Sequence, residues 1–364
     1  MNLWRVAVRI AFVDGSLDLV DQMVQALDGF GLDWEVLTVP GPGAGDGPDA
    51  LDVLVSGLPI EPAARERLAA LRAQHPDAMR VLLLEPGQEA GALGLLDGAH
   101  RVLQKPMDAD ELINAVEGIV DLRELLDSEV LKGYVGRIDA LPAAPRMYFQ
   151  LSKLMGDPDV GLGRIADELS QDPALVARVL RLCNSAYFSA GREITDTRSA
   201  VARLGLQTVH QVVLASETFG HAEGLSVIER EAMQDRALRI SRLAARVLPG
   251  SSADQAATAG LLVEVGRLLP PPSDGSPAPE YNEAGAYLLG LWGLPMPIVE
   301  AVAFHRQPRR MHGTGFWITG ALHVAAALVT GEPLDEAYLR SVGMLGKVPQ
   351  WQALMQQDLA RAAA

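Results

Sequence analysis

The stretch VLQKPMDADEL (102–112) contains a lysine whose position suggests chemistry. Lys105 closes an apolar run, Pro106 follows it, and the acidic residues typical of a helix start come next. In open parallel sheets, reactive side chains gather at the carboxyl ends of the strands. A lysine at such an end usually faces a carboxylate that can accept a phosphoryl group. The use of Lys105 therefore depends on the residues that end the other strands.

Four further apolar runs in the first 120 residues have the length of strands. Amphipathic stretches at 16–31 and 62–75 lie between them, with apolar residues every three or four positions. This alternation predicts a parallel sheet covered on both faces. The runs are RVAVRIAFV (5–13), WEVLTV (34–39), LDVLVSGL (51–58) and MRVLLLE (79–85), and the last strand is HRVLQK (100–105). Residues at their carboxyl ends are Asp14, Gly15, Gly57, Glu85 and Lys105.

This arrangement closely resembles the receiver domain of two-component response regulators, over about residues 5–120. The resemblance is carried by the strand order, by FVDG, by LPI after the third strand and by the Lys-Pro pair. That family holds magnesium with an acidic pair after the first strand, of which Asp14 keeps one member and Gly15 replaces the other. Gly57 stands in the place of the phosphoacceptor aspartate, and Glu85 in that of a hydroxyl residue. The resemblance thus implies a pseudo-receiver that lacks the phosphoacceptor and binds magnesium weakly.

Glu85 offers a use for the remaining lysine. In the receiver strand order the fourth and fifth strands are neighbours, so Glu85 and Lys105 would project from adjacent carboxyl ends. We expect a standing ion pair that fixes the domain in one signalling conformation. The alternative is a solvated glutamate near a lysine, which contributes little to stability.

Apolar residues continue at helical spacing through 108–138, which predicts one long helix. Its stripe consists of Leu112, Val116, Ile119, Leu122, Leu126 and Val130. Such a stripe packs onto its own chain or forms the seam of a homodimer through 108–135, and the sequence leaves both open. IDALPAAP (138–145) then breaks the helix and marks a domain boundary.

The remainder of the chain has the pattern of an all-helical domain. LPAAPRMYFQL, DPDVGLGRIADELSQDPALVARVLRLCNSAYFS and GAYLLGLWGLPMPIVEAVAFH resemble the HDOD domain, a relative of the HD metal-dependent phosphohydrolases. The expected fold class is α/β plus all-α. The predicted domains are a five-stranded, flavodoxin-like pseudo-receiver domain (1–120), a helical connector (121–138), an HDOD domain (139–335) and a helical tail (336–364).

The HD phosphohydrolases bind metal through a histidine, an adjacent His-Asp pair and a later aspartate. The matching positions here are Ile240, Val263, Glu264 and Ala326. Only Glu264 has a lone pair to donate, and one carboxylate does not hold a catalytic ion. The resemblance therefore implies neither a bound metal nor another cofactor, and we predict that the chain is not an enzyme.

Two other groups of residues are candidate binding sites. His305, His312 and His323 match no common metal-ligand spacing, which favours core histidines. Arg306, Arg309 and Arg310 are a candidate clamp for a phosphate or a nucleotide, although their pattern favours a solvated basic turn.

Composition restricts the partners. The net charge of −15 argues against general affinity for nucleic acid or anionic membranes. A turn at Gly205 within 195–219 is reminiscent of a helix-turn-helix, but its second helix has no lysine or arginine and carries Glu217, so we expect no DNA reading. The single cysteine, Cys183, fits a reducing compartment. No apolar run approaches the ~20 residues that span a bilayer, so a cytoplasmic protein without membrane insertion is expected.

These observations predict a non-catalytic bacterial signal-transduction regulator of the two-component type. It would act by protein–protein interaction, its HDOD domain docking a signalling partner whose identity the sequence does not specify. The alternative is an HDOD protein that senses a cyclic dinucleotide.

Overall fold

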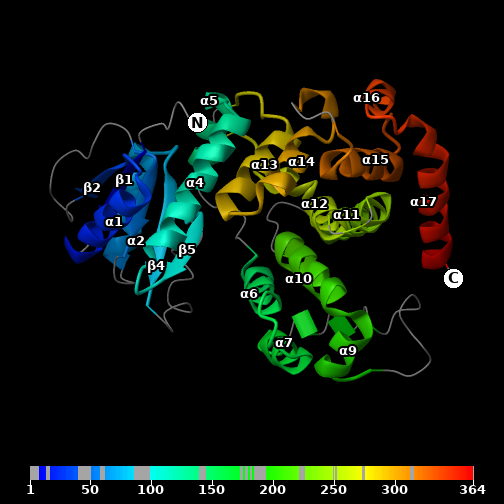
Figure 1. Ribbon diagram of the computed structural model, residues 1–364, viewed down its shortest axis with the longest axis horizontal. Coiled ribbons are helices and arrows are strands. Elements are labelled where there is room, and N and C mark those ends of the chain that lie inside the picture. The colour runs from blue at the N-terminus through cyan, green and yellow to red at the C-terminus, as the bar shows by residue number, and fades with distance from the viewer. Residues whose placement is uncertain are drawn as a thin grey trace. The chain divides into compact units, whose positions relative to one another are not determined.

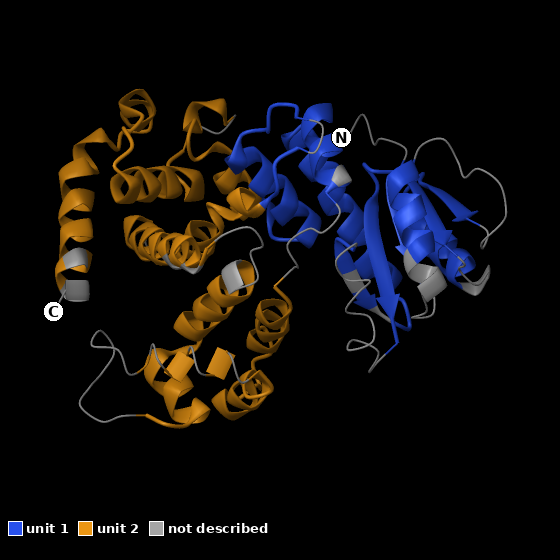
Figure 2. Cartoon of the chain, turned by 180° about the vertical axis from the view of Figure 1, so that it is seen from behind, with its two compact units in different colours: residues 1–143, 269–296 blue, residues 144–268, 297–364 orange. Residues whose placement is uncertain are grey.

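The computed structural model describes most of the chain. The described residues are 8–13, 17–39, 51–57, 62–85, 99–138, 145–172, 175–176, 179–180, 183, 194–220, 226–248, 250, 252–272, 275–311 and 315–363. The chain divides into two compact units, which Figure 2 shows in different colours. Unit 1 contains residues 1–143 and 269–296, and unit 2 contains residues 144–268 and 297–364.

Unit 1 is built on a parallel sheet of five strands in the order β2-β1-β3-β4-β5 (Figure 1). This 2-1-3-4-5 order is that of the flavodoxin-like doubly wound sheets. Every residue of β3 and β4 is buried, which requires cover on both faces and explains their continuous apolar sequences. The strands are β1 (Arg9–Val13), β2 (Glu35–Val39), β3 (Val53–Ser56), β4 (Met79–Leu84) and β5 (Arg101–Gln104).

The helices of unit 1 come from two separate parts of the chain, residues 1–143 and 269–296. Leu71 of α2 packs with Ala11, Val13 and Leu54 of the sheet, while α1 contacts α4. The helices are α1 (Leu17–Phe30), α2 (Pro62–Gln74), α4 (Ala109–Leu125), α5 (Glu129–Arg137) and α13 (Tyr281–Trp292).

The predicted long helix through 108–138 is two helices, α4 and α5. α4 ends at Leu125, and the Ser128 side chain accepts a hydrogen bond from the Leu131 backbone N–H at 3.3 Å to begin α5. Serine is a preferred N-cap because its hydroxyl satisfies an otherwise unpaired amide. The periodic stripe did not reveal this break.

The apolar stripe of that segment lies mostly inside the chain. Five of its members are at most 5% exposed, and only Val130 is open to solvent, at 71%. The stripe thus packs onto its own protein, which is one of the two interpretations that the sequence left open. A homodimer through this segment stays a prediction.

In its described residues, unit 2 consists of helices joined by loops, with no strands. Its centre is formed by α11, α12 and α15, which pack against one another. Gly260 allows the close approach of α12 to α11, because a Cβ there would lie 2.6 Å from the Cα of Ser241. Cys183 is fully buried.

The helices of this unit are α6 (Arg146–Met155), α7 (Leu162–Leu169), α9 (Thr197–Leu204), α10 (Leu206–Gly220), α11 (Val227–Val247), α12 (Ala253–Leu262), α14 (Met296–Phe304), α15 (Ile318–Thr330), α16 (Glu336–Ser341) and α17 (Val348–Ala363), with short 3-10 turns η1 (Val265–Leu268), η2 (Pro308–Arg310) and η3 (Leu345–Lys347). Within the described part of the chain, none of the helices is both long and apolar enough to cross a bilayer.

Candidate functional site

The carboxyl edge of the sheet brings Gly57, Glu85 and Lys105 together. The pairing of β5 with β4 extends one residue past the end of β5. The backbone N–H of Lys105 donates a hydrogen bond to the Leu84 carbonyl at 2.8 Å. Lys105 Nζ then lies 3.3 Å from Glu85 Oε1 and donates a hydrogen bond to the carbonyl oxygen of Gly57 at 3.2 Å. The predicted ion pair is confirmed as a contact. Asp14 and Gly15, the other two predicted residues, lie outside the described residues.

Lys105 occupies the space that a side chain at position 57 would need. A Cβ on Gly57 would lie 3.3 Å from Lys105 Cε and 3.4 Å from its Nζ. A backbone carbonyl therefore receives the ammonium group where the receiver family has a carboxylate. The Lys105 side chain is 26% exposed and that of Glu85 52%, so the pair contributes at most about 1 kcal/mol. Its importance is positional, since it connects the ends of three strands.

The four positions that match the HD metal site lie in the central helices of unit 2. Ile240 is in α11, Val263 and Glu264 follow α12, and Ala326 is in α15. All four are buried. Three are apolar, so only one carboxylate is available to a cation.

Glu264 is already bound by two guanidinium groups. Its Oε2 accepts from Arg236 Nε at 2.8 Å, and its Oε1 lies 3.1 Å from Arg267 Nε. The Glu264 side chain is 6% exposed, whereas the two arginines reach toward solvent. These residues do not fit a metal ion, because the one anionic ligand is neutralised by cations of the chain itself. In the described ranges no group of three or more His, Cys, Asp or Glu side chains is placed to hold a metal.

The three candidate clamp arginines turn to separate partners. Arg309 Nε donates to Asp335 Oδ2 at 2.8 Å, and Arg306 Nε lies 3.8 Å from Glu332 Oε2. The guanidinium carbon of Arg310 is 5.3 Å from the centre of the Phe304 ring. This geometry does not favour a common anion site.

Two of these histidines, His305 and His323, are linked by a series of hydrogen bonds in the core. The Nε2 of His323 accepts from the Asp335 backbone N–H at 2.8 Å, so its Nδ1 carries the proton and donates to the His305 carbonyl at 2.7 Å. His305 Nδ1 bonds the Val302 carbonyl at 2.9 Å. Burial lowers the pKa of His323 and lowers the pKa of His305 to about 4. Both are core histidines, as their spacing predicts, while His312 is outside the described residues.

Sequence reasoning missed a role for Glu217, which it used only as an argument against DNA reading. The two carboxylate oxygens accept the backbone N–H groups of Met147 and Tyr148 at 2.9 and 2.8 Å. The N-cap residue of α6 is Pro145, whose side chain makes no capping hydrogen bond. A glutamate from α10 therefore caps α6 from a distance of about 70 residues in the sequence, and no local pattern could have signalled it.

Comparison with known proteins identifies the class of the helical part: residues 141–270 match the HDOD domain family. This confirms the HDOD resemblance for those residues, and a receiver domain at the N-terminus is not shown.

The individual proteins that the chain resembles are 30% identical to it or less over the aligned residues. A Treponema pallidum (strain Nichols) protein of uncharacterised function is 30% identical over 197 residues, which are 46% of this chain and 38% of that protein. The chain thus spans about two fifths of its relative's length. An HDOD domain protein of unknown function from Geobacter sulfurreducens has the same fold with a TM-score of 0.50 and 20% identity, covering 67% of this chain and 95% of its own.

Two further structures have lower scores. A candidate signal transduction protein from Marinobacter aquaeolei VT8 is 18% identical with a TM-score of 0.47, covering 83% of this chain and 84% of its own. A candidate metal-dependent phosphohydrolase from Shewanella amazonensis SB2B is 21% identical with a TM-score of 0.43, covering 65% and 90%.

The prediction that the chain is not an enzyme is contradicted by this last comparison, because proteins similar to it include a candidate phosphohydrolase. The prediction rested on four positions of one metal site. Those positions describe that site and no other, so they do not decide whether the chain has an activity elsewhere.

Proposed function

We propose that this chain is a bacterial signal-transduction regulator of the two-component type, whose sheet unit is a receiver-like domain that works without the phosphoacceptor aspartate. Its HDOD domain docks a signalling protein. The observation that carries the proposal is the contact of Lys105 with Glu85 and with the Gly57 carbonyl. The lysine is engaged by fixed groups of the chain, so the edge of the sheet is held in one arrangement without phosphorylation.

The strand order and the HDOD match support this proposal from two sides. The sheet has the 2-1-3-4-5 order in which ligand chemistry belongs at the carboxyl edge, and Lys105 stands at that edge. The family match of residues 141–270 supports a regulatory role for the helical part. A docked partner would recognise the conformation of the receiver-like domain and not a phosphoryl group on it.

A phosphotransfer experiment tests the regulatory half of the proposal. We would incubate the full chain with acetyl phosphate and Mg²⁺ and measure its intact mass. No phosphoryl group should be added, because position 57 has no carboxylate. A stable acyl-phosphate species, mapped to the carboxyl edge of the sheet, would refute the proposal.

An interaction experiment tests the other half. The full chain and its Glu85→Gln variant would be immobilised in parallel and exposed to the same bacterial lysate. We expect one signalling protein in fixed stoichiometry, with a different amount retained by the variant. Equal retention by both would show that the carboxyl edge does not govern docking.

Calorimetry with cyclic dinucleotides distinguishes the nucleotide-sensing alternative. We expect no heat of binding, because Arg306, Arg309 and Arg310 have separate partners. Saturable binding that is lost in an Arg306→Ala variant would establish the alternative.

A further inference from the structure

The segment 269–296 belongs to unit 1, although it follows the HDOD-matched residues in the sequence. Figure 2 shows this segment in the colour of the sheet unit. Its helix, α13, packs against α4 and α5. At the start of the segment, the Tyr134 hydroxyl of α5 donates to the Pro270 carbonyl at 2.6 Å. A piece of chain from beyond the HDOD match is thus docked on the sheet unit.

Arg101, the first residue of β5, binds the end of α13. Its Nε donates to the Leu291 carbonyl at 3.2 Å and its Nη2 to the Gly290 carbonyl at 3.4 Å. These are among the last carbonyls of the helix, where unpaired oxygens and the helix dipole favour a cation. Burial lowers the pKa of Arg101 to about 10, which still leaves it charged at neutral pH.

Gly293 makes room for this contact. It has a φ of +85° as the left-handed cap of α13, and a Cβ there would lie 2.8 Å from Arg101 Cζ. Glycine is required both by the backbone conformation and by the guanidinium. The end of α13 is therefore shaped to receive the arginine of β5.

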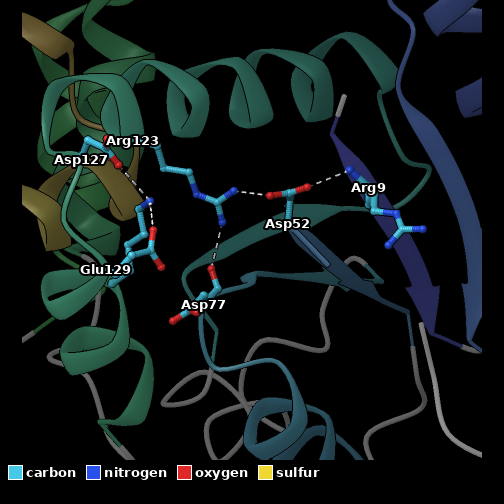
Figure 3. Close-up of polar contacts among 7 residues, drawn as sticks. Arg9, Asp52, Asp77, Arg123, Asp127 and Glu129 are labelled. Carbon is cyan, nitrogen blue, oxygen red and sulfur yellow. Dashed lines mark hydrogen bonds and ion pairs between the residues drawn. The ribbon is translucent and has the colours of Figure 1, made fainter. Parts of the chain in front are cut away.

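α4 packs on the carboxyl-terminal half of the same helix. Leu122, which is fully buried, lies over Gly290, where a Cβ would come within 2.5 Å of its Cδ2. Burial raises the pKa of Tyr287 in α13, and the positive charge of Arg123, the residue after Leu122, partly offsets that rise. Figure 3 shows Arg123 also reaching Asp52, ahead of β3, and the Asp77 carbonyl, ahead of β4, at 3.0 Å. Arg123 thus connects α13 to the amino edge of the sheet.

We propose that α13 is a releasable partner of the sheet unit, and that its docking transmits the state of the Lys105 edge to the HDOD domain. The proposal rests on the proposed function only in treating that edge as the regulated one. α4 is the connecting element: its N-cap, Asp108, is three residues after Lys105, and its last turns carry Leu122 and Arg123.

The far ends of the segment complete the connection. At one end, the segment follows directly after η1, which ends at Leu268. Arg267 of η1 forms an ion pair with the Glu264 carboxylate. At the other end α14 begins, which leads to His305. A displacement of α4 changes the contacts of α13, and α13 is continuous with both elements. The hydrogen bonds of Arg101 at the helix end are of the kind that local opening breaks first.

Hydrogen exchange of the full chain, measured by mass spectrometry, tests whether α13 is held by Arg101. The variants are Arg101→Met, which keeps the aliphatic stem, and the milder Tyr287→Phe. The control is Arg198→Met, which removes an exposed arginine 3.9 Å from Asp167. We expect Arg101→Met to speed exchange in 281–292 at least tenfold while α9 and α10 keep their rates. Unchanged exchange in α13, or an equal rise along the whole chain, would overturn the proposal.

A double-mutant cycle tests the transmission itself. Lys105→Met should change the exchange rate of 281–292 in the wild-type background and have no effect there when Arg101→Met is present. Equal effects of Lys105→Met in both backgrounds would show that α13 is a structural support only. This result is separate from the phosphotransfer experiment, which can fail while the cycle still shows coupling.

Discussion

Glu85 and Glu264 both bind basic side chains, but burial gives the two carboxylates different energetic weights. Glu85 is half exposed and shares Lys105 with a backbone carbonyl. Glu264 is 6% exposed and receives two guanidinium groups. At the surface, the gain from an ion pair is offset by the loss of hydration and of side-chain entropy. A buried carboxylate that loses its partners has neither water nor a cation to stabilise its charge.

We expect Glu85→Gln to leave stability nearly unchanged, with a loss in the free energy of unfolding of less than about 1 kcal/mol. The remaining hydrogen bond from Lys105 to Gly57 keeps the lysine in place. Urea denaturation of the variant and of Glu35→Gln, which breaks another half-exposed pair with Arg9, provides the comparison. A loss well above that of Glu35→Gln would mean that the edge pair does more than position three strands.

Glu264→Gln should destabilise the HDOD domain by about 1–3 kcal/mol, because two charge-assisted hydrogen bonds are weakened in a buried setting. Urea denaturation measures this loss. The matched control is Asp235→Asn, whose carboxylate is 72% exposed and 3.9 Å from Arg239, and which should change stability little. If the two variants behave alike, the Arg-Glu-Arg contact is not a stabilising feature.

The two sites also differ in how far sequence could predict them. The Glu85–Lys105 contact followed from strand order, because neighbouring parallel strands bring their carboxyl ends together. Arg236 is 28 residues before Glu264 on another helix, and only the packing of α11 on α12 joins them. Sequence spacing therefore identified Glu264 as a remnant carboxylate but could not place Arg236 beside it, whereas Arg267 is only three residues away.

At the scale of elements, periodicity predicted the helices better than their ends. The apolar stripe of 108–138 is continuous in the sequence, yet the helix is interrupted and a new helix begins after Ser128. After the break Leu131 and Val135 are buried, whereas Val130 is 71% exposed. The apolar phase moves by one residue at the cap, which a search for a single period does not detect because adjacent valine and leucine satisfy both phases.

Glu217→Ala should cost about 1–2 kcal/mol, the range for loss of a helix N-cap. The expected loss is local, because the carboxylate bonds the first amides of α6, namely those of Met147 and Tyr148. Hydrogen exchange should therefore rise in 146–155 more than in α11 or α12. Asp167→Ala, at a carboxylate that is 77% exposed, is the control, and a similar exchange pattern in both variants would contradict the capping role.

At the scale of the whole molecule, the division into units differs from the order of the sequence. Motifs placed 269–296 within one helical domain, but α13 packs with the sheet unit. Arg101 and Leu291, which join them, are 190 residues apart. Helical periodicity is the same whichever partner a helix buries its face against, so the sequence could predict α13 as a helix and could not predict its neighbours.

The histidines give the whole chain a shared response to acid. Each of the five described histidines has its pKa lowered, with burial as the largest cause: His75, His100, His210, His305 and His323. Above the usual pKa near 6.5 they are neutral in both the folded and the unfolded chain. Below it the unfolded chain binds protons that the folded chain does not, so the free energy of unfolding falls as the pH falls.

His305 allows this effect to be measured at one residue. With a folded pKa of about 4, it should remove up to about 3 kcal/mol of stability between pH 6.5 and 4, at 1.36 kcal/mol for each unit of pKa difference. Urea denaturation at successive pH values should give a shallower pH dependence for His305→Leu than for the wild type, whatever the absolute stability of the variant. Equal slopes for the two proteins would show that His305 is protonated in the fold as easily as in the unfolded chain. A steeper slope in the variant would contradict the sign of the pKa shift itself.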